Sequence, residues 1–331
     1  MQFWQGTIIY LVIINLITFA MYGTDKNKAR NHKWRIPERT LIFMAFIGGG
    51  LGAIIGMNIF HHKTQKPKFK ILVPIGLVLT IVITILATYG NNHLEVTTYE
   101  YDAGLNCKIV HLSDVHNTTI YWNKDALPKA VKDLDPDYIV ITGDLIDSIH
   151  TDMDSAIYTA KALAEITDTY YVTGNHELRL SEDDLNTFHA RLREAGVIIL
   201  SNEYVTLTDN SGTEFALIGL DDANLGDDTL KGIMSTIDKD LPTILLAHEP
   251  QYFDNYADSN VNYVLSGHYH AGQFVIAGRG FITPEFEIFP EYSFGEKTTN
   301  NTTLITSRGI GNSIIPWRIN NQPEIVVIEM N

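Results

Sequence analysis

Five apolar runs in this chain each end in side chains that can bind a metal ion, and this pattern limits the possible folds sharply. Ile109–Leu112 is β-branched and apolar, as a buried strand is, and Asp114 and His116 follow it. A single Asp-x-His pair is weak support for a metal site, because a solvated loop explains most such pairs. Four later runs end in the same way, before Asp144, before Asn175 and His176, before His248, and before His268 and His270. Open α/β sheets place their sites at the carboxyl ends of strands, so we expect these side chains to converge.

Between these runs the chain alternates strand-like with helix-like segments and then turns to paired strands. Helices are expected at residues 123–134, 153–166 and 181–195, the last opening with a Ser181-x-x-Asp184 cap. Further strands are expected at 96–101, 197–200, 204–208 and 215–220, with a hairpin turn at 209–212. This order predicts an α/β domain of two mixed sheets packed together, with helices outside.

The ordered blocks D-x-H, G-D-x-x-D, G-N-H-E, a lone His and G-H-x-H resemble the signature of calcineurin-like metallophosphoesterases. The resemblance covers about residues 95–331 and implies their αββα sandwich. The closing residues 307–313 and 316–325 are further similar to a bacterial membrane-associated branch, the YkuE-type and YaeI-type enzymes.

The resemblance also implies how the side chains divide between two divalent cations. Asp144 would bridge the two ions. Asp114, His116 and His270 would complete one site, and Asn175, His248 and His268 the other. Imidazole, carboxylate and amide donors suit Mn²⁺, Zn²⁺ or iron. Two such ions would acidify a shared water, so the expected nucleophile is a metal-bridging hydroxide.

His176 is left over as a proton donor next to a metal ligand, and it is our candidate for the general acid. The alternative is a structural histidine behind the site. Asp147 and Glu177 are expected to orient imidazoles instead of binding metal. The sequence departs from the related branch at Tyr269 and at 271–273, which puts the fit of substrate in doubt. The loop 278–295 could contact an apolar substrate, or its aromatic residues could simply anchor it.

The first 93 residues have a different character. Uncharged apolar runs at about 7–22, 40–60 and 71–89 are each long enough, or nearly so, to cross a bilayer. We therefore expect a membrane domain of two to three spans at 1–93 and a phosphoesterase domain at 94–331. Residues 25–26, 34–40, 49–53 and 61–64 resemble the DUF1294 membrane family, from which no function can be carried over.

Charge is distributed unevenly between these two parts. Residues 1–93 contain ten Lys or Arg and two Asp or Glu, whereas the remainder contains 14 and 37. The acidic part lacks the basic stripe that nucleic-acid binding requires. If all three runs span, the two basic loops lie on opposite faces. If the glycine-rich middle run is a re-entrant hairpin, both loops stay inside and the third run exports the domain. The flank 91–102 has no Lys or Arg, which favours an extracytoplasmic domain.

These features together predict a membrane-anchored, binuclear phosphomonoesterase or phosphodiesterase in the cell membrane. The tether makes a lipid-linked or cell-envelope phosphate a reasonable substrate. The alternative is a non-catalytic metal-binding membrane scaffold or sensor, which would be expected to lack a ligand. Cys107 is the only cysteine, so intrachain disulfides and zinc–thiolate clusters are excluded.

Overall fold

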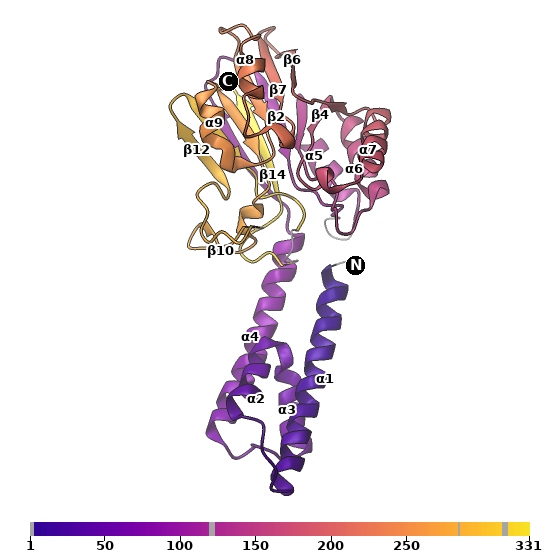
Figure 1. Cartoon of the computed structure of the whole chain (residues 1–331), viewed down its shortest axis with the longest axis vertical. Helices are drawn as coiled ribbons and strands as arrows, with labels where there is room; N and C mark the ends of the chain where they lie inside the picture. Colours follow the sequence, from indigo (N-terminus) through magenta and orange to yellow (C-terminus); the bar gives the residue numbers. More distant parts are fainter. Residues whose placement is uncertain (1–2, 119–122, 284, 313–316) are drawn as a thin grey trace. The chain divides into compact units, whose positions relative to one another are not determined.

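The computed structural model of the chain describes residues 3–118, 123–283, 285–312 and 317–331. It contains two compact units, Met1–Tyr89 and Gly90–Asn331, each of which folds around its own core (Figure 1).

In the described residues of the first unit, every secondary-structure element is a helix. Its elements are α1 (Phe3–Arg30), α2 (Glu38–Met44), a short π-helix (Ala45–Gly49), α3 (Gly50–Ile59) and α4 (Pro67–Asn92), the last of which continues into the second unit. Within the described residues, three helical segments are long and apolar enough to cross a membrane: Gly6–Arg30, Glu38–Ile59 and Pro67–Asn92. The three apolar runs expected from the sequence lie in these segments.

The middle segment is not one straight helix. Its backbone leaves the helical region at Ile47 and at Gly48, whose φ of 107° is in the left-handed region that favours glycine. Lys63, just after α3, forms an ion pair of 2.8 Å with Glu38, the first residue of α2. A straight 22-residue helix would hold its ends about 33 Å apart, so the segment must reverse. It forms a helical hairpin.

Charged side chains link two loops of this unit, the one between α1 and α2 and the one between α3 and α4. Buried Asp25, near the end of α1, accepts a bond of 2.9 Å from Arg35 and lies 2.7 Å from His62. Arg35 belongs to the connection before α2 and His62 to the one after α3. Both basic connections therefore lie at the same end of the first unit.

The turn of the hairpin is held by a polar residue of α1. Asn15 donates its amide N–H to Gly48 O at 2.9 Å, and its oxygen accepts the backbone N–H of Gly52 at 2.7 Å. A break in a helix leaves such backbone groups without partners, and in apolar surroundings they must be satisfied by the protein itself. Asn15 supplies both partners from a neighbouring helix.

The second unit consists of two six-stranded mixed sheets. The first has the order β1-β14-β2-β3-β4-β5 and the second β12-β13-β9-β8-β7-β6. The strands of the first sheet are β1 (Glu95–Tyr101), β2 (Cys107–Leu112), β3 (Tyr138–Thr142), β4 (Thr169–Val172), β5 (Ile198–Ile199) and β14 (Glu324–Met330). Those of the second are β6 (Glu203–Thr208), β7 (Glu214–Gly219), β8 (Thr243–Leu246), β9 (Tyr263–Ser266), β12 (Gly295–Thr299) and β13 (Thr302–Thr306). A short pair, β10 (Val275–Ile276) and β11 (Arg279–Gly280), lies apart from both.

Helices accompany both sheets. They are α5 (Ala126–Asp133), α6 (Met153–Ala164), α7 (Glu182–Glu194), α8 (Thr229–Met234) and α9 (Phe253–Asp258), with 3₁₀ turns at Glu177–Arg179, Asp222–Asn224, Pro250–Tyr252 and His270–Gly272. The predicted Ser181 cap is confirmed, since its side chain accepts the backbone N–H of Asp184. The helix expected from residue 123 is shorter than predicted and begins at Ala126.

The central strands are buried on both faces, which explains their continuous apolar runs. Ile109 and Val140 pack between the sheets with Leu217 and Leu246, whereas Val110 and Ile139 belong to the core that includes α5–α7 residues. The predicted fold of two mixed sheets flanked by helices is confirmed.

Strand direction then positions the side chains predicted to bind metal. β2, β3 and β4 are mutually parallel in the first sheet, and β8 and β9 are parallel in the second. The five loops that follow these strands carry the predicted ligands, and the fold brings these loops together.

Candidate metal centre

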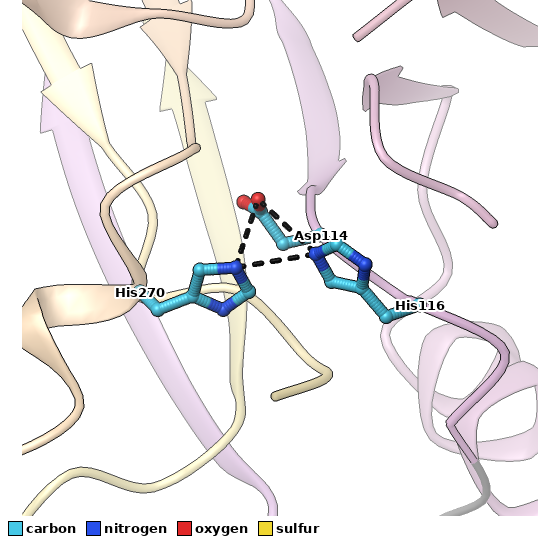
Figure 2. Close-up of side chains that lie close together, drawn as sticks. All are labelled: Asp114, His116 and His270. Carbon is cyan, nitrogen blue, oxygen red and sulfur yellow. Dashed lines mark hydrogen bonds and ion pairs between the residues drawn. The ribbon is translucent and has the colours of Figure 1, made fainter. Parts of the chain in front are cut away.

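Asp114, His116 and His270 form one buried cluster (Figure 2). His270 Nε2 lies 3.4 Å from Asp114 Oδ1 and 3.2 Å from His116 Nε2. Asp114 and His116 come from the loop after β2, and His270 from the loop after β9. The cluster therefore joins the two sheets at their ligand-bearing edges.

A second buried cluster contains Asp144, His248 and His268. His248 Nε2 lies 3.3 Å from Asp144 Oδ2, 3.3 Å from His268 Nδ1 and 3.1 Å from the amide oxygen of Asn175. Asp144 Oδ2 is also 3.5 Å from His116 Nε2 in the first cluster. One carboxylate oxygen of Asp144 thus lies within 3.5 Å of a histidine from each cluster, as a bridging group would.

The backbone is constrained where it presents these side chains. Asp114, Asp144, His268 and His270 all have φ between 48° and 69°, in the left-handed region that non-glycine residues rarely adopt. Close approach also demands a glycine before His268, because a Cβ at Gly267 would lie 1.8 Å from Ser113 Oγ and 2.2 Å from Asp114 Oδ2. The G-H-x-H spacing therefore reflects packing as well as chemistry.

The electrostatics keep the carboxylates charged. Burial alone would raise the pKa of Asp114, but His270 and His248 hold it below its usual value. The pKa of Asp144 is likewise held well below normal, against burial, chiefly by His248. Anionic oxygens surrounded by imidazole nitrogens, all within 4.8 Å in each cluster, are the donor set that borderline divalent cations prefer. The residues present therefore fit two metal ions.

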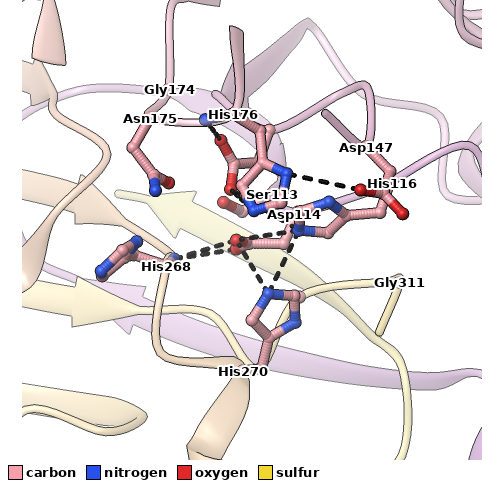
Figure 3. A network of polar contacts seen from close by, with 12 residues as sticks. Ser113, Asp114, His116, Asp147, Gly174, Asn175, His176, His268, His270 and Gly311 are labelled. Atoms are coloured by element: carbon pink, nitrogen blue, oxygen red, sulfur yellow. Dashed lines mark hydrogen bonds and ion pairs between the residues drawn. The ribbon is translucent and has the colours of Figure 1, made fainter. Parts of the chain in front are cut away.

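His176 lies at the edge of the clusters (Figure 3). Its Nε2 is 3.9 Å from Asp144 Oδ2, and its ring contacts that of His116 edge to face. Its Nδ1 lies 3.6 Å from Asp147 Oδ1. Burial would lower the pKa of His176, but the bond to Asp147 and the charge of Asp144 raise it above the ordinary value. Asp147 is therefore placed as expected, beside an imidazole.

Glu177 differs from its expected role. Its buried carboxylate accepts the backbone N–H groups of Asp144, Ile146 and Gly174 at 2.9–3.1 Å. It fixes the backbone of the two ligand loops after β3 and β4, and the expectation that it orients an imidazole is wrong.

Two residues that were not predicted from the sequence contact the predicted ligands. Glu285 Oε1 lies 3.1 Å from His268 Nε2. Arg318, which we did not connect with the site, is fully buried, and its guanidinium lies 3.4 Å from His270 Nδ1. The sequence feature that could have drawn attention to Arg318 is its position as a lone charged residue between Trp317 and Ile319. Ser313 and Pro316, which contributed to the predicted resemblance, lie outside the described residues.

Comparison with protein families matches residues 107–272 to the calcineurin-like phosphoesterases, and residues 15–69 to DUF1294, a family of unknown function. The chain belongs to the calcineurin-like phosphoesterase family, whose members are hydrolases acting on phosphate esters at a centre of two metal ions.

Three relatives illustrate this relationship. The chain is 30% identical over 228 residues to the uncharacterized metallophosphoesterase YkuE of Bacillus subtilis, covering 67% of this chain and 78% of that one. It is 32% identical over 249 residues to a bovine transmembrane protein with a metallophosphoesterase domain, covering 70% of this chain and 55% of the other. The uncharacterized protein YsdA of B. subtilis is 47% identical over 74 residues, which are 22% of this chain and 83% of YsdA.

Proposed function

We propose that the chain is a membrane-anchored phosphohydrolase with a membrane domain at 1–93 and a catalytic domain at 94–331. The observation that carries the proposal is the convergence of seven side chains from five strand ends into two adjoining clusters. These are Asp114, His116, Asp144, Asn175, His248, His268 and His270. None of the ligands expected from the sequence is absent from the clusters, which argues against a non-catalytic scaffold.

In this proposal Asp144 would contribute to both cation sites, Asp114, His116 and His270 would hold one cation, and Asn175, His248 and His268 would hold the other. When bound, the cations supply Lewis acidity that lowers the pKa of a water between them and neutralises phosphoryl oxygens. The protein's part is to fix the donor atoms, and the buried bonds of Glu177 to the loop backbones serve that end.

His176 is proposed as the general acid that protonates the leaving oxygen of the substrate. Two features support this role. Its Nδ1 lies between Asp147 and the backbone N–H of Ser148, and its Nε2 lies on the side of Asp144 and Arg179. The raised pKa also keeps the ring protonated to higher pH than an isolated histidine.

A lipid-linked or cell-envelope phosphate is the proposed substrate class. Glu285, which contacts His268, belongs to the loop 278–295. In the same loop Phe286 and Ile288 are exposed, with 72% and 61% of their surface accessible. Tyr292 instead anchors this loop through a ring contact with Phe253 of α9, and Phe281 and Phe289 pack against each other within the loop. An apolar surface beside the ligands suits a substrate with an apolar part, in a chain with apolar helices of membrane-spanning length.

We further propose that the catalytic domain is extracytoplasmic. The hairpin of α2 and α3 brings both basic connections to one end of the first unit, so a single cytoplasmic face can hold them. α1 and α4 would each cross once, and the hairpin would be re-entrant. The N-terminus and the residues after α4 would then lie on the outer side.

Single-cysteine labelling tests this topology. In a Cys107→Ala background, an impermeant thiol reagent should label Asp133→Cys in intact cells, whereas Arg30→Cys and Lys68→Cys should react only after lysis. Opposite accessibility of Arg30→Cys and Lys68→Cys would show that the middle segment spans the membrane and would overturn the hairpin topology.

The activity itself is tested with the full chain in detergent, stripped of metal and resupplied with Mn²⁺ or Zn²⁺. Hydrolysis of p-nitrophenyl phosphate or bis-p-nitrophenyl phosphate should return with metal, and the ratio of the two rates separates a monoesterase from a diesterase. Two bound metals with no hydrolysis of these esters or of a lipid phosphate would favour the scaffold.

A further inference from the structure

Each predicted histidine ligand presents one ring nitrogen to the clusters and the other to the surrounding protein. The inward nitrogens are Nε2 of His116, His248 and His270, and Nδ1 of His268. The groups behind the outward nitrogens are not equivalent. Because a partner behind an imidazole changes how strongly the ring donates to a cation, the two sites need not bind metal equally.

In the cluster with Asp144, both outward nitrogens face acceptors. His248 Nδ1 lies 2.7 Å from the backbone oxygen of Thr142, and His268 Nε2 lies 3.1 Å from the carboxylate of Glu285. A carbonyl or carboxylate can only accept, so each ring carries its proton on the outward nitrogen and its lone pair on the inward one. Such a partner orients the ring and increases its basicity.

In the cluster with Asp114, neither outward nitrogen faces an acceptor. His270 Nδ1 faces the guanidinium of Arg318 at 3.4 Å, and a guanidinium has no acceptor. Arg318 is held in place by the carbonyls of Arg308 and Gly311, to which it donates. His116 Nδ1 is buried and has no hydrogen-bond partner in the described part of the chain. Neither ring is therefore backed by an acceptor.

The charges of the residues behind the histidines also favour the cluster of Asp144. The predicted ligands by themselves would favour the cluster of Asp114, because it has a carboxylate of its own where the other has the neutral Asn175. Arg318 places a buried positive charge behind that cluster, and Glu285 places a negative charge behind the other. The outer residues thus oppose the order that the ligands by themselves would set.

We propose that Glu285 and Arg318 are positioning residues that make the two cation sites unequal, so that the site of His248 and His268 binds its ion more tightly. The site of Asp114, His116 and His270 is then the weaker, exchangeable one. This inference rests on the ligand assignment of the proposed function. It concerns the affinity of the protein for metal and is measured without substrate.

Isothermal titration calorimetry of the metal-stripped full chain with Mn²⁺ tests it. The wild type should bind two ions in two resolved steps. His268→Ala should remove the tighter step and His116→Ala the weaker one, in variants whose circular dichroism matches the wild type. Two equal steps, or loss of the weaker step in His268→Ala, would overturn the inference while leaving the binuclear proposal intact. A wild type that binds no Mn²⁺ would instead overturn the proposed function.

Glu285→Gln should weaken the tighter step about 10- to 100-fold and leave the weaker step unchanged. Glu287→Gln is the matched control, because it removes the same charge from an exposed position of the same loop and should change neither step. Arg318→Met should strengthen the weaker step. If that variant does not fold, Arg318→Lys, which keeps the charge, should leave the weaker step weak. Unchanged affinities in Glu285→Gln would refute the role assigned to Glu285.

Discussion

The buried carboxylate of Glu177 accepts the backbone N–H of Asp144 at 3.0 Å. The same carboxylate accepts two more backbone N–H groups, so one side chain ties the loop after β3 to the loop after β4. Glutamine has one acceptor oxygen and would leave at least one buried donor unpaired. We expect Glu177→Gln to lower the free energy of unfolding by about 1–3 kcal/mol. Thermal unfolding of the metal-free chain would show this as a lower midpoint.

The cost of Glu177→Gln should also depend on pH. Burial, together with Asp144, raises the pKa of Glu177 to about 7 from an ordinary value of 4.5. The stability gained from its protonated form is present below pH 4.5 and is lost as the pH rises through about 7. The difference between wild type and variant should therefore shrink between pH 5 and pH 8. Glu194→Gln, at the exposed end of α7, is the control and should show no such trend.

Asp144→Ala should abolish metal binding and turnover together, because one of its oxygens lies within 3.5 Å of both His116 and His248. Calorimetry with Mn²⁺ and hydrolysis of p-nitrophenyl phosphate measure the two losses on one preparation. A purified Asp144→Ala chain that keeps wild-type rates would refute the site assignment.

His176→Ala should keep both metals and lose turnover, since the ring is assigned to protonate the leaving group. The supporting measurement is a pH profile of kcat. Asp147 raises the pKa of His176, so Asp147→Asn should lower that pKa and move the alkaline loss of activity to lower pH. If the pH at which kcat falls is unchanged in Asp147→Asn, a group other than His176 controls that fall.

The sequence predicted the sandwich and the convergence of the ligands for the same physical reason. Strands such as Ile109–Leu112 are buried on both faces and read as continuous apolar runs, and ligands at their ends must meet when the strands are parallel. Glu285 and Arg318 could not be found in this way. Each lies 17 or 48 residues beyond the histidine that it contacts, in a segment whose path is set by tertiary packing and not by any periodic pattern.

The sequence was compatible both with a middle run that spans the membrane and with one that reverses at Gly48. Hydropathy reports how apolar a segment is and not its direction. What decides the direction is a set of long-range polar contacts. The bond from Lys63 to Glu38 joins the ends of the hairpin, and Asn15 holds its turn. Such pairs have no local signature.

Gly267→Ala should disrupt the cluster of Asp114 without replacing a ligand. The added methyl group would fall 2.2 Å from Asp114 Oδ2 and 1.8 Å from Ser113 Oγ, so either the carboxylate or the loop after β9 must shift. We expect loss of one of the two Mn²⁺ binding steps. Gly232→Ala, in α8 with no atom within 4 Å of the added Cβ, should bind metal as the wild type does.

Asn15→Leu tests the hairpin of the first unit. The substitution keeps the size of the side chain but removes the partners of Gly48 O and Gly52 N, which lie among apolar helices. Hydrogen bonds of this kind in membranes are each worth about 0.6–1.7 kcal/mol, so the first unit should lose about 1–3 kcal/mol. Asn58→Leu makes the same exchange at an exposed position of α3 and should leave stability unchanged. Thermal unfolding in detergent compares the two variants. If they unfold alike, the turn does not depend on Asn15, and the polar clamp would have no part in holding the hairpin.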